Sequence, residues 1–169
     1  MRTRLLLVLA LPCALGSCDH YEDLDENPDC SLPGEPALDP ALQDGAPTLI
    51  IGEPDASDGA FVTWADDDVV SARYGSQGAV MLAPTLRLAD QGARAERCLH
   101  VRFTASGPEE ASISNAFEFS EDAGDLVAGP IFIPLSGTDF DDDFDVRAVV
   151  SGELYQSVAE VRVHLVGAL

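Results

Sequence analysis

The sequence contains no lysine, and its nine basic residues, all arginine, face 30 acidic residues, so the formal net charge is −21. A nucleic-acid-binding protein needs a basic patch to neutralise phosphates, and a basic patch is also what an anionic membrane surface attracts. Without lysine, Schiff-base, P-loop and Ser–Lys mechanisms are excluded. We therefore expect no nucleic-acid partner, and an anionic bilayer is disfavoured as a partner of the protein surface.

Motifs of catalysis and zinc binding are also missing. The chain has no Gly-x-Ser-x-Gly elbow, no His-x-x-His or Glu-x-x-His, and no cluster of cysteine and histidine. Of its three histidines, His20 precedes the predicted domain, and His100 and His164 fall on predicted outer strand faces, where histidine is solvated or paired across strands. Acidic strands offer glycosidase-like carboxylate pairs by chance. We predict that the protein is not an enzyme and keep catalysis as a distant alternative.

Long apolar runs are confined to the N-terminus. Arg2 and Arg4 precede an unbroken apolar run over residues 5–11, and the segment closes with Leu15-Gly16-Ser17-Cys18. These proportions are typical of a secretory signal peptide and are too short for a bilayer span of about 20 residues. The closing tetrapeptide resembles the lipobox of bacterial lipoproteins, which has an aliphatic residue at −3, small residues at −2 and −1, and then cysteine.

The resemblance implies that Cys18 is lipidated and that cleavage precedes it. Cleavage would leave 152 residues with a formal charge of −23. Acyl chains at about 0.8 kcal/mol per buried methylene hold a protein stably on a lipid bilayer. We therefore expect a lipid-anchored protein of the cell envelope, on the periplasmic face or the outer surface. Cys13 fits the pattern poorly because Pro12 precedes it, and an ordinary signal peptide with a chance cysteine is the alternative.

Residues 18–46 have the composition of a disordered acidic tether. Residues 19–46 carry nine acidic and no basic residues and are rich in proline. Self-repulsion and proline extend such a chain, although an acidic segment for a basic partner is an alternative. Cys30 and Cys98 are the thiols that remain after export to an oxidising compartment, where they predict a disulfide. Its span of 68 residues is worth about 4 kcal/mol in the chain-entropy model.

Residues 47–169 show the period-2 alternation of strands. The clearest segments are 98–103, 113–119, 143–150 and 157–166, with further strands at 48–51, 60–65, 79–88 and 131–135. Turn residues separate them, and residues 90–97 are assigned to a loop. We predict an all-β fold, a single antiparallel β-sandwich. An immunoglobulin-like form is compatible with these strands, but Trp64, 34 residues from both Cys30 and Cys98, does not have the spacing of that family. The alternation places Cys98 on the outer face, where the tether could reach it.

A second resemblance covers residues 52–105. Gly52-Glu53, the acidic turn Asp66-Asp67-Asp68 and Gly75-Ser76-Gln77-Gly78 are similar to a group of exported β-sandwich lipoproteins from GC-rich Gram-negative bacteria. Those proteins read Gly-x-Gln-Gly-Gly-x-His, whereas Ala79 and Met81 stand at the last two positions here. The resemblance implies a fold and a location but no activity.

One acidic cluster has a spacing that suggests a metal. Asp139, Asp141, Asp143 and Asp145 lie in alternate positions, and carboxylates crowded into a turn favour Ca²⁺. Val146 and Gly152 stand where an EF-hand needs glycine and glutamate, so an EF-hand is excluded. A looser calcium site, shared with the acidic turn at 66–68, competes with a solvated turn that protects the next strand from aggregation.

We predict a membrane-anchored envelope lipoprotein whose β-sandwich binds an envelope protein or glycan or has a structural role, with no cofactor. The alternative is a calcium-dependent adhesion-like module.

Overall fold

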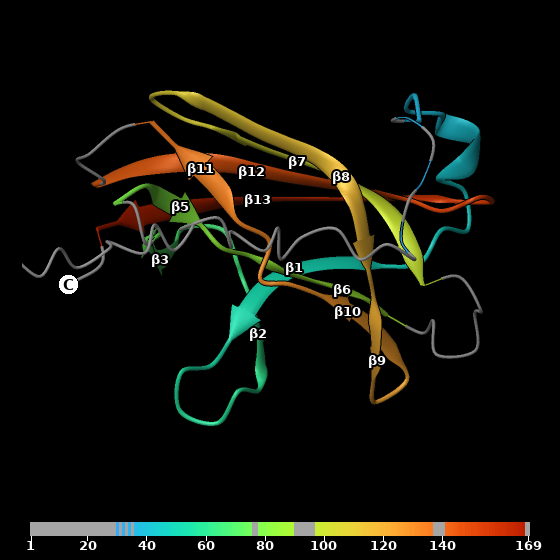
Figure 1. Cartoon of the computed structure of the whole chain (residues 1–169), viewed down its shortest axis with the longest axis horizontal. Helices are drawn as coiled ribbons and strands as arrows, with labels where there is room; N and C mark the ends of the chain where they lie inside the picture. The colour runs from blue at the N-terminus through green and yellow to red at the C-terminus, as the bar shows by residue number, and fades with distance from the viewer. Residues whose placement is uncertain are drawn as a thin grey trace, which may run out of the picture.

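The computed structural model describes residues 30, 32, 34, 36–75, 78–89, 97–136 and 141–167. Within them, the chain forms a β-sandwich of two layers (Figure 1). The larger sheet has the strand order β3 (Asp68–Ser71), β13 (Gln156–Val166), β12 (Asp141–Ser151), β7 (Cys98–Ser106) and β8 (Glu110–Glu118). The other layer begins with the order β2 (Phe61–Thr63), β1 (Leu49–Pro54), β6 (Thr85–Leu88), β10 (Asp125–Ala128) and β9 (Ser120–Asp122).

A three-stranded sheet continues this second layer, in the order β11 (Ile133–Leu135), β5 (Val80–Leu82) and β4 (Arg73–Tyr74). Strand β11 pairs with β5 as β10 pairs with β6, and between the two pairs the Ile131 N–H donates to the Pro84 carbonyl at 2.8 Å. Pro84 has no N–H for a sheet ladder. The single strand predicted over residues 79–88 is therefore two strands, β5 and β6, which continue each other.

The strand order agrees with an immunoglobulin-type sandwich. Naming strands by that convention, β1, β6, β10 and β9 form an A-B-E-D sheet, and β13, β12, β7 and β8 form a G-F-C-C′ sheet. After β1 the chain turns back as β2 in the same sheet and then crosses to the larger sheet, where β3 pairs parallel to β13, from Val163↔Asp68 to Val166↔Ser71. The sequence had predicted an antiparallel sandwich. The parallel pairing of β3 with β13 makes the larger sheet mixed instead.

Alternating apolar side chains from both layers form one hydrophobic core. From the larger sheet it includes Leu99, Val101, Phe103, Phe144, Val146, Val163 and Leu165, and from the other layer Leu82, Leu86, Leu88, Leu126 and Ile133. Burial of this apolar surface is the main stabilising contribution to such a domain. The alternation predicted for β7, β12 and β13 is confirmed, and it leaves the polar residues of these strands on the opposite side of the sheet.

None of the described residues forms a helix long and apolar enough to cross a bilayer; the helical element among them is the 3-10 turn η1 (Pro40–Leu42).

Candidate functional site

The larger sheet has one side against the core, and its other side, which we call the outer face, carries nearly all its polar side chains. Two different structures occupy the outer face. At the end where β7 begins and β12 turns into β13, residues 36–47 lie against the sheet, and we call this segment the strap. At the other end, charged side chains of β12 and β13 pair with each other across the strands.

The strap is attached by its own hydrogen bonds and by a disulfide six residues before it. Cys30 and Cys98 form a disulfide with a Cα–Cα distance of 5.2 Å, which confirms the predicted pairing. Arg102 Nη2 donates to the Pro36 carbonyl at 3.3 Å. At the end of the strap, before β1, Ser157 Oγ, on the core side of β13, donates to the Pro47 carbonyl at 2.8 Å. The segment that composition assigns to a disordered tether is therefore, over residues 36–46, part of the folded domain.

Gln156 forms the centre of this attachment. Its side-chain Nε2 donates to the Ala37 carbonyl at 2.9 Å, and its Oε1 accepts from the Asp39 N–H at 2.6 Å. The Gln156 amide thus contacts the strap backbone as a neighbouring strand would, with one donor and one acceptor. Only 1% of Gln156 is exposed, so this amide depends on the strap for partners that water cannot supply.

The burial extends to other polar groups beside Gln156. Ser151, whose Oγ accepts a hydrogen bond from Gln156 Nε2 at 3.2 Å, is buried, and so is His100, which is opposite Ser151 in the ladder. Of the two surroundings expected for His100, solvent or a cross-strand partner, solvent is wrong, because the residue is buried. It lies on the outer side of β7, as the alternation predicts, at the covered end of the face.

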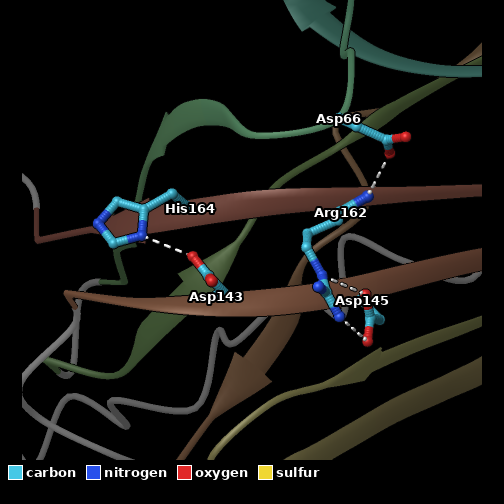
Figure 2. A network of polar contacts seen from close by, with 5 residues as sticks. All are labelled: Asp66, Asp143, Asp145, Arg162 and His164. Atoms are coloured by element: carbon cyan, nitrogen blue, oxygen red, sulfur yellow. Dashed lines mark hydrogen bonds and ion pairs between the residues drawn. The ribbon is translucent and has the colours of Figure 1, made fainter.

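The charged end of the outer face is a ladder of ion pairs across β12 and β13 (Figure 2). Arg162 Nε and Nη2 reach the two carboxylate oxygens of Asp145 at 2.8 and 3.0 Å. His164 lies between two carboxylates, with Nδ1 2.8 Å from Asp143 Oδ1 and Nε2 2.9 Å from Asp141 Oδ1. One ladder step away, Arg147 Nε pairs with Glu160 Oε1 at 2.9 Å.

These contacts decide the charge states of the ladder. The hydrogen bonds to Asp143 and Asp141 raise the pKa of His164 above its ordinary value. A carboxylate only accepts, so the two contacts of His164 require a proton on each ring nitrogen, that is, an imidazolium. The hydrogen bonds from Arg162 lower the pKa of Asp145. In the ladder, three cationic side chains therefore pair with four carboxylates, since His164 contacts two of them.

The acidic turn at residues 66–68 lies beside the same ladder. Asp66 Oδ1 accepts from the Arg162 N–H at 3.0 Å, and the Asp67 N–H donates to the Arg162 carbonyl at 2.9 Å. Asp68 Oδ2 accepts from the Ala65 N–H at 2.7 Å, closing the turn. Asp67 has a φ of 68°, a left-handed conformation that aspartate tolerates better than most residues. Two of the three aspartates thus have a structural role at the start of β3.

An open groove of about 820 Å³ follows the charged ladder. Its lining is mostly polar and comes from the acidic turn and from β7, β12 and β13: Asp66, Asp67, Thr104, Ser106, Asp145, Val146, Arg147, Glu160, Val161 and Arg162. Both arginines in this groove are paired with carboxylates, and the four acidic residues outnumber them. The groove therefore has an excess of negative charge and offers hydroxyl groups from Thr104 and Ser106.

The sequence-based site predictions have different outcomes. Cys18 and Asp139 lie outside the described residues, as do Ser76 and Gln77 of the glycine motif. Asp141, Asp143 and Asp145 share one face of β12, but they pair with His164 and Arg162. Over the described part of the chain, no three His, Cys, Asp or Glu residues come together as metal ligands would. Calcium binding stays an alternative to the solvated acidic turn.

Sequence reasoning missed Gln156 and the register of the ladder. Nothing in the sequence marks Gln156, since its partners Ala37 and Asp39 lie more than a hundred residues away. The ladder had a partial signal, because aspartates alternate in one predicted strand while Arg162 and His164 alternate in the next.

The comparisons with known proteins give no family. No family description matches the chain, and a search of curated proteins finds no match. Among solved structures, the chain is similar to the CooA pilin subunit from enterotoxigenic Escherichia coli, with 10% sequence identity and a TM-score of 0.36. The similarity covers 73% of this chain and 99% of the pilin chain, and at this level it carries no inference about function.

Proposed function

We propose that this protein is a lipid-anchored protein of the bacterial cell envelope, attached through Cys18, whose sandwich domain is a binding or structural module. The sequence Leu15-Gly16-Ser17-Cys18 at the end of a short apolar run carries the proposal. Two or three acyl chains are enough for stable attachment, because each buried methylene contributes about 0.8 kcal/mol.

The disulfide supports the exported location. Disulfides persist in oxidising compartments such as the periplasm and the cell surface and are rare in the cytosol. Three cysteines follow the proposed cleavage site, and the bond between Cys30 and Cys98 leaves Cys18 as the thiol available for acylation.

The outer face supports the binding part of the proposal. A groove with exposed carboxylates, hydroxyl groups and paired arginines suits polar contacts with a protein or a glycan, and its charge disfavours a polyanion. Its open, mostly polar form does not resemble an enzyme pocket with an apolar wall and a few convergent polar groups.

The test is expression of the full chain in a Gram-negative host, followed by intact mass and detergent phase separation. We expect the mass of the polypeptide from Cys18 onward plus its acyl groups, and recovery in the detergent phase. Cys18→Ala should lose both properties, and the matched control Cys13→Ala should keep them. A mass equal to the bare polypeptide, or a Cys18→Ala variant that still enters the detergent phase, would contradict the proposal.

A further inference from the structure

We infer that the disulfide and the Gln156 contacts determine which end of the sandwich faces the bilayer: the end with the β12–β13 turn lies near the membrane, and the charged end of the outer face points away from it. The inference rests on the proposed lipid anchor at Cys18. It adds the orientation of the domain and an upper limit on its distance from the membrane, neither of which the anchor itself specifies.

We call residues 18–47, which include the strap, the N-terminal arm. The attachments that its described residues make to the larger sheet lie at one end of that sheet. Cys98, which holds Cys30, is the first residue of β7, and Gln156 is the first residue of β13. Ser151, in contact with Gln156, is the last residue of β12. Figure 1 shows the strap and its short helical turn beside the β12–β13 turn, with β3 at the opposite end of the molecule. A chain that reaches a membrane anchor through Cys30 therefore leaves the domain at this end.

The charged ladder lies at the other end of the same strands. Val69 is opposite His164 in the β3–β13 pairing, and His164 is eight residues beyond Gln156 along β13. At about 3.4 Å per residue, these positions are about 27 Å apart. Asp66, Asp143 and Asp145 lie at the same end as His164 (Figure 2).

The disulfide also shortens the arm. Cys18 and Cys30 are separated by twelve residue steps, which span at most about 40 Å when fully extended. To bring the charged end to the bilayer, the arm would have to extend about 27 Å alongside the domain, and such extension costs chain entropy. Without the disulfide, the first attachment would be Pro36, after eighteen steps, and the limit would be about 61 Å.

Energy transfer from the lipidated full chain to headgroup acceptors in vesicles with anionic lipid tests this orientation. A donor is incorporated as a non-natural amino acid, so that no new cysteine competes for the disulfide, at Leu154 in the β12–β13 turn or at Val69. These side chains are 83% and 67% exposed, so labels at both positions should leave the fold intact. We expect transfer from position 154 to exceed transfer from position 69 by about twofold or more. Leu154 lies in the turn before Gln156 and Val69 is opposite His164, and these two positions of β13 are about 27 Å apart.

The Cys30→Ser/Cys98→Ser double variant should reduce this difference and lower the transfer from position 154, because the arm becomes longer. Equal transfer from the two positions in the disulfide-bonded protein, or greater transfer from position 69, would overturn the inference, and this comparison needs no variant of the disulfide. A protein that does not bind vesicles at all contradicts the lipid anchor instead, so the two failures are distinguishable.

Discussion

The side chain of Gln156 accepts a hydrogen bond from the backbone N–H of Asp39 at 2.6 Å, although 117 residues separate the two in the sequence. The same amide donates to the Ala37 carbonyl, so one buried side chain pairs with both the Asp39 N–H and the Ala37 carbonyl of the strap. An unpaired buried polar group costs about 1–3 kcal/mol. If the strap detached, the buried Gln156 amide would lose both of these hydrogen bonds, and this cost keeps the strap in place.

We predict that Gln156→Ala lowers the free energy of unfolding by about 1–3 kcal/mol, because the Asp39 N–H and the Ala37 carbonyl both lose their partner. Gln156→Glu keeps an acceptor for the Asp39 N–H but places a carboxylate oxygen against the Ala37 carbonyl. At neutral pH this variant should therefore be no more stable than Gln156→Ala, and in acid, where the carboxyl group is protonated and can donate, it should recover part of the lost stability. Urea denaturation of the disulfide-bonded protein measures both variants. A Gln156→Glu variant as stable as the parent would show that the amide contacts contribute little.

The Cys30→Ser/Cys98→Ser double variant tests the covalent part of the attachment. Opening a loop of 68 residues should lower stability by up to about 4 kcal/mol, since the unfolded chain gains freedom. Limited proteolysis should then cut the chain before residue 36, while the contacts of Gln156 still protect residues 37–39. Equal proteolysis of the parent and the variant would mean that the disulfide does not restrain the arm.

Much of the sandwich was predictable because its long strands alternate strictly. Strands β7, β12 and β13 follow the expected period, and their parity correctly placed Cys98 on the face that the strap crosses. Four short strands, β3, β4, β9 and β10, were missed, whereas the short strands β2 and β11 lie within the predicted segments 60–65 and 131–135. Strand β3 has four residues and β4 has two, and both follow an acidic turn that has the composition of a loop.

Pairing between distant segments could not be predicted. Alternation states which face a residue occupies but not which residue is opposite it, so the contact of His164 with Asp143 needed the register of the β12–β13 hairpin. The packing of residues 36–46 against the sheet could not be predicted for the same reason. Their acidic, proline-rich composition is that of a free chain, but they are held by Gln156, the first residue of the last strand, which is more than a hundred residues away in the sequence.

Gly52 illustrates a packing constraint in the other layer. A Cβ at Gly52 would collide with the Val62 carbonyl and lie 2.7 Å from the Phe61 ring, which packs against the Arg87 guanidinium at 4.8 Å. We predict that Gly52→Ala lowers stability by about 1–3 kcal/mol, the usual cost of overpacking. The matched control is Gly167→Ala, whose new Cβ meets only the Tyr74 hydroxyl at 3.8 Å and should be nearly neutral. Thermal melting of the two variants decides whether the β1–β2 contact is as rigid as the distances indicate.

His164 should make part of the stability depend on pH. The hydrogen bonds that His164 donates to Asp143 and Asp141 raise its folded-state pKa above the unfolded value of about 6.5. The stabilisation is therefore complete below about pH 6.5 and is lost as the pH rises through the raised folded-state pKa. We expect the difference in melting temperature between the parent and His164→Gln to shrink between pH 6 and pH 9. Titration of the His164 ring by NMR gives the pKa directly, and a value at or below the ordinary one would contradict the imidazolium assignment.

The charged ladder also predicts the response to calcium. Ca²⁺ takes six to eight oxygen ligands, and the carboxylates of Asp143 and Asp145 already pair with His164 and Arg162. A calcium ion would have to displace these cations, so we expect no change in melting temperature between chelator and millimolar calcium. A ligand that binds only the folded state at 100 times its dissociation constant adds about 2.7 kcal/mol, so a site of this strength would be evident. Magnesium controls for ionic strength. A rise that is specific to calcium and is lost in both Asp139→Asn and Asp143→Asn would establish the calcium-dependent module instead, because it would show that the ion opens the ladder and recruits Asp139.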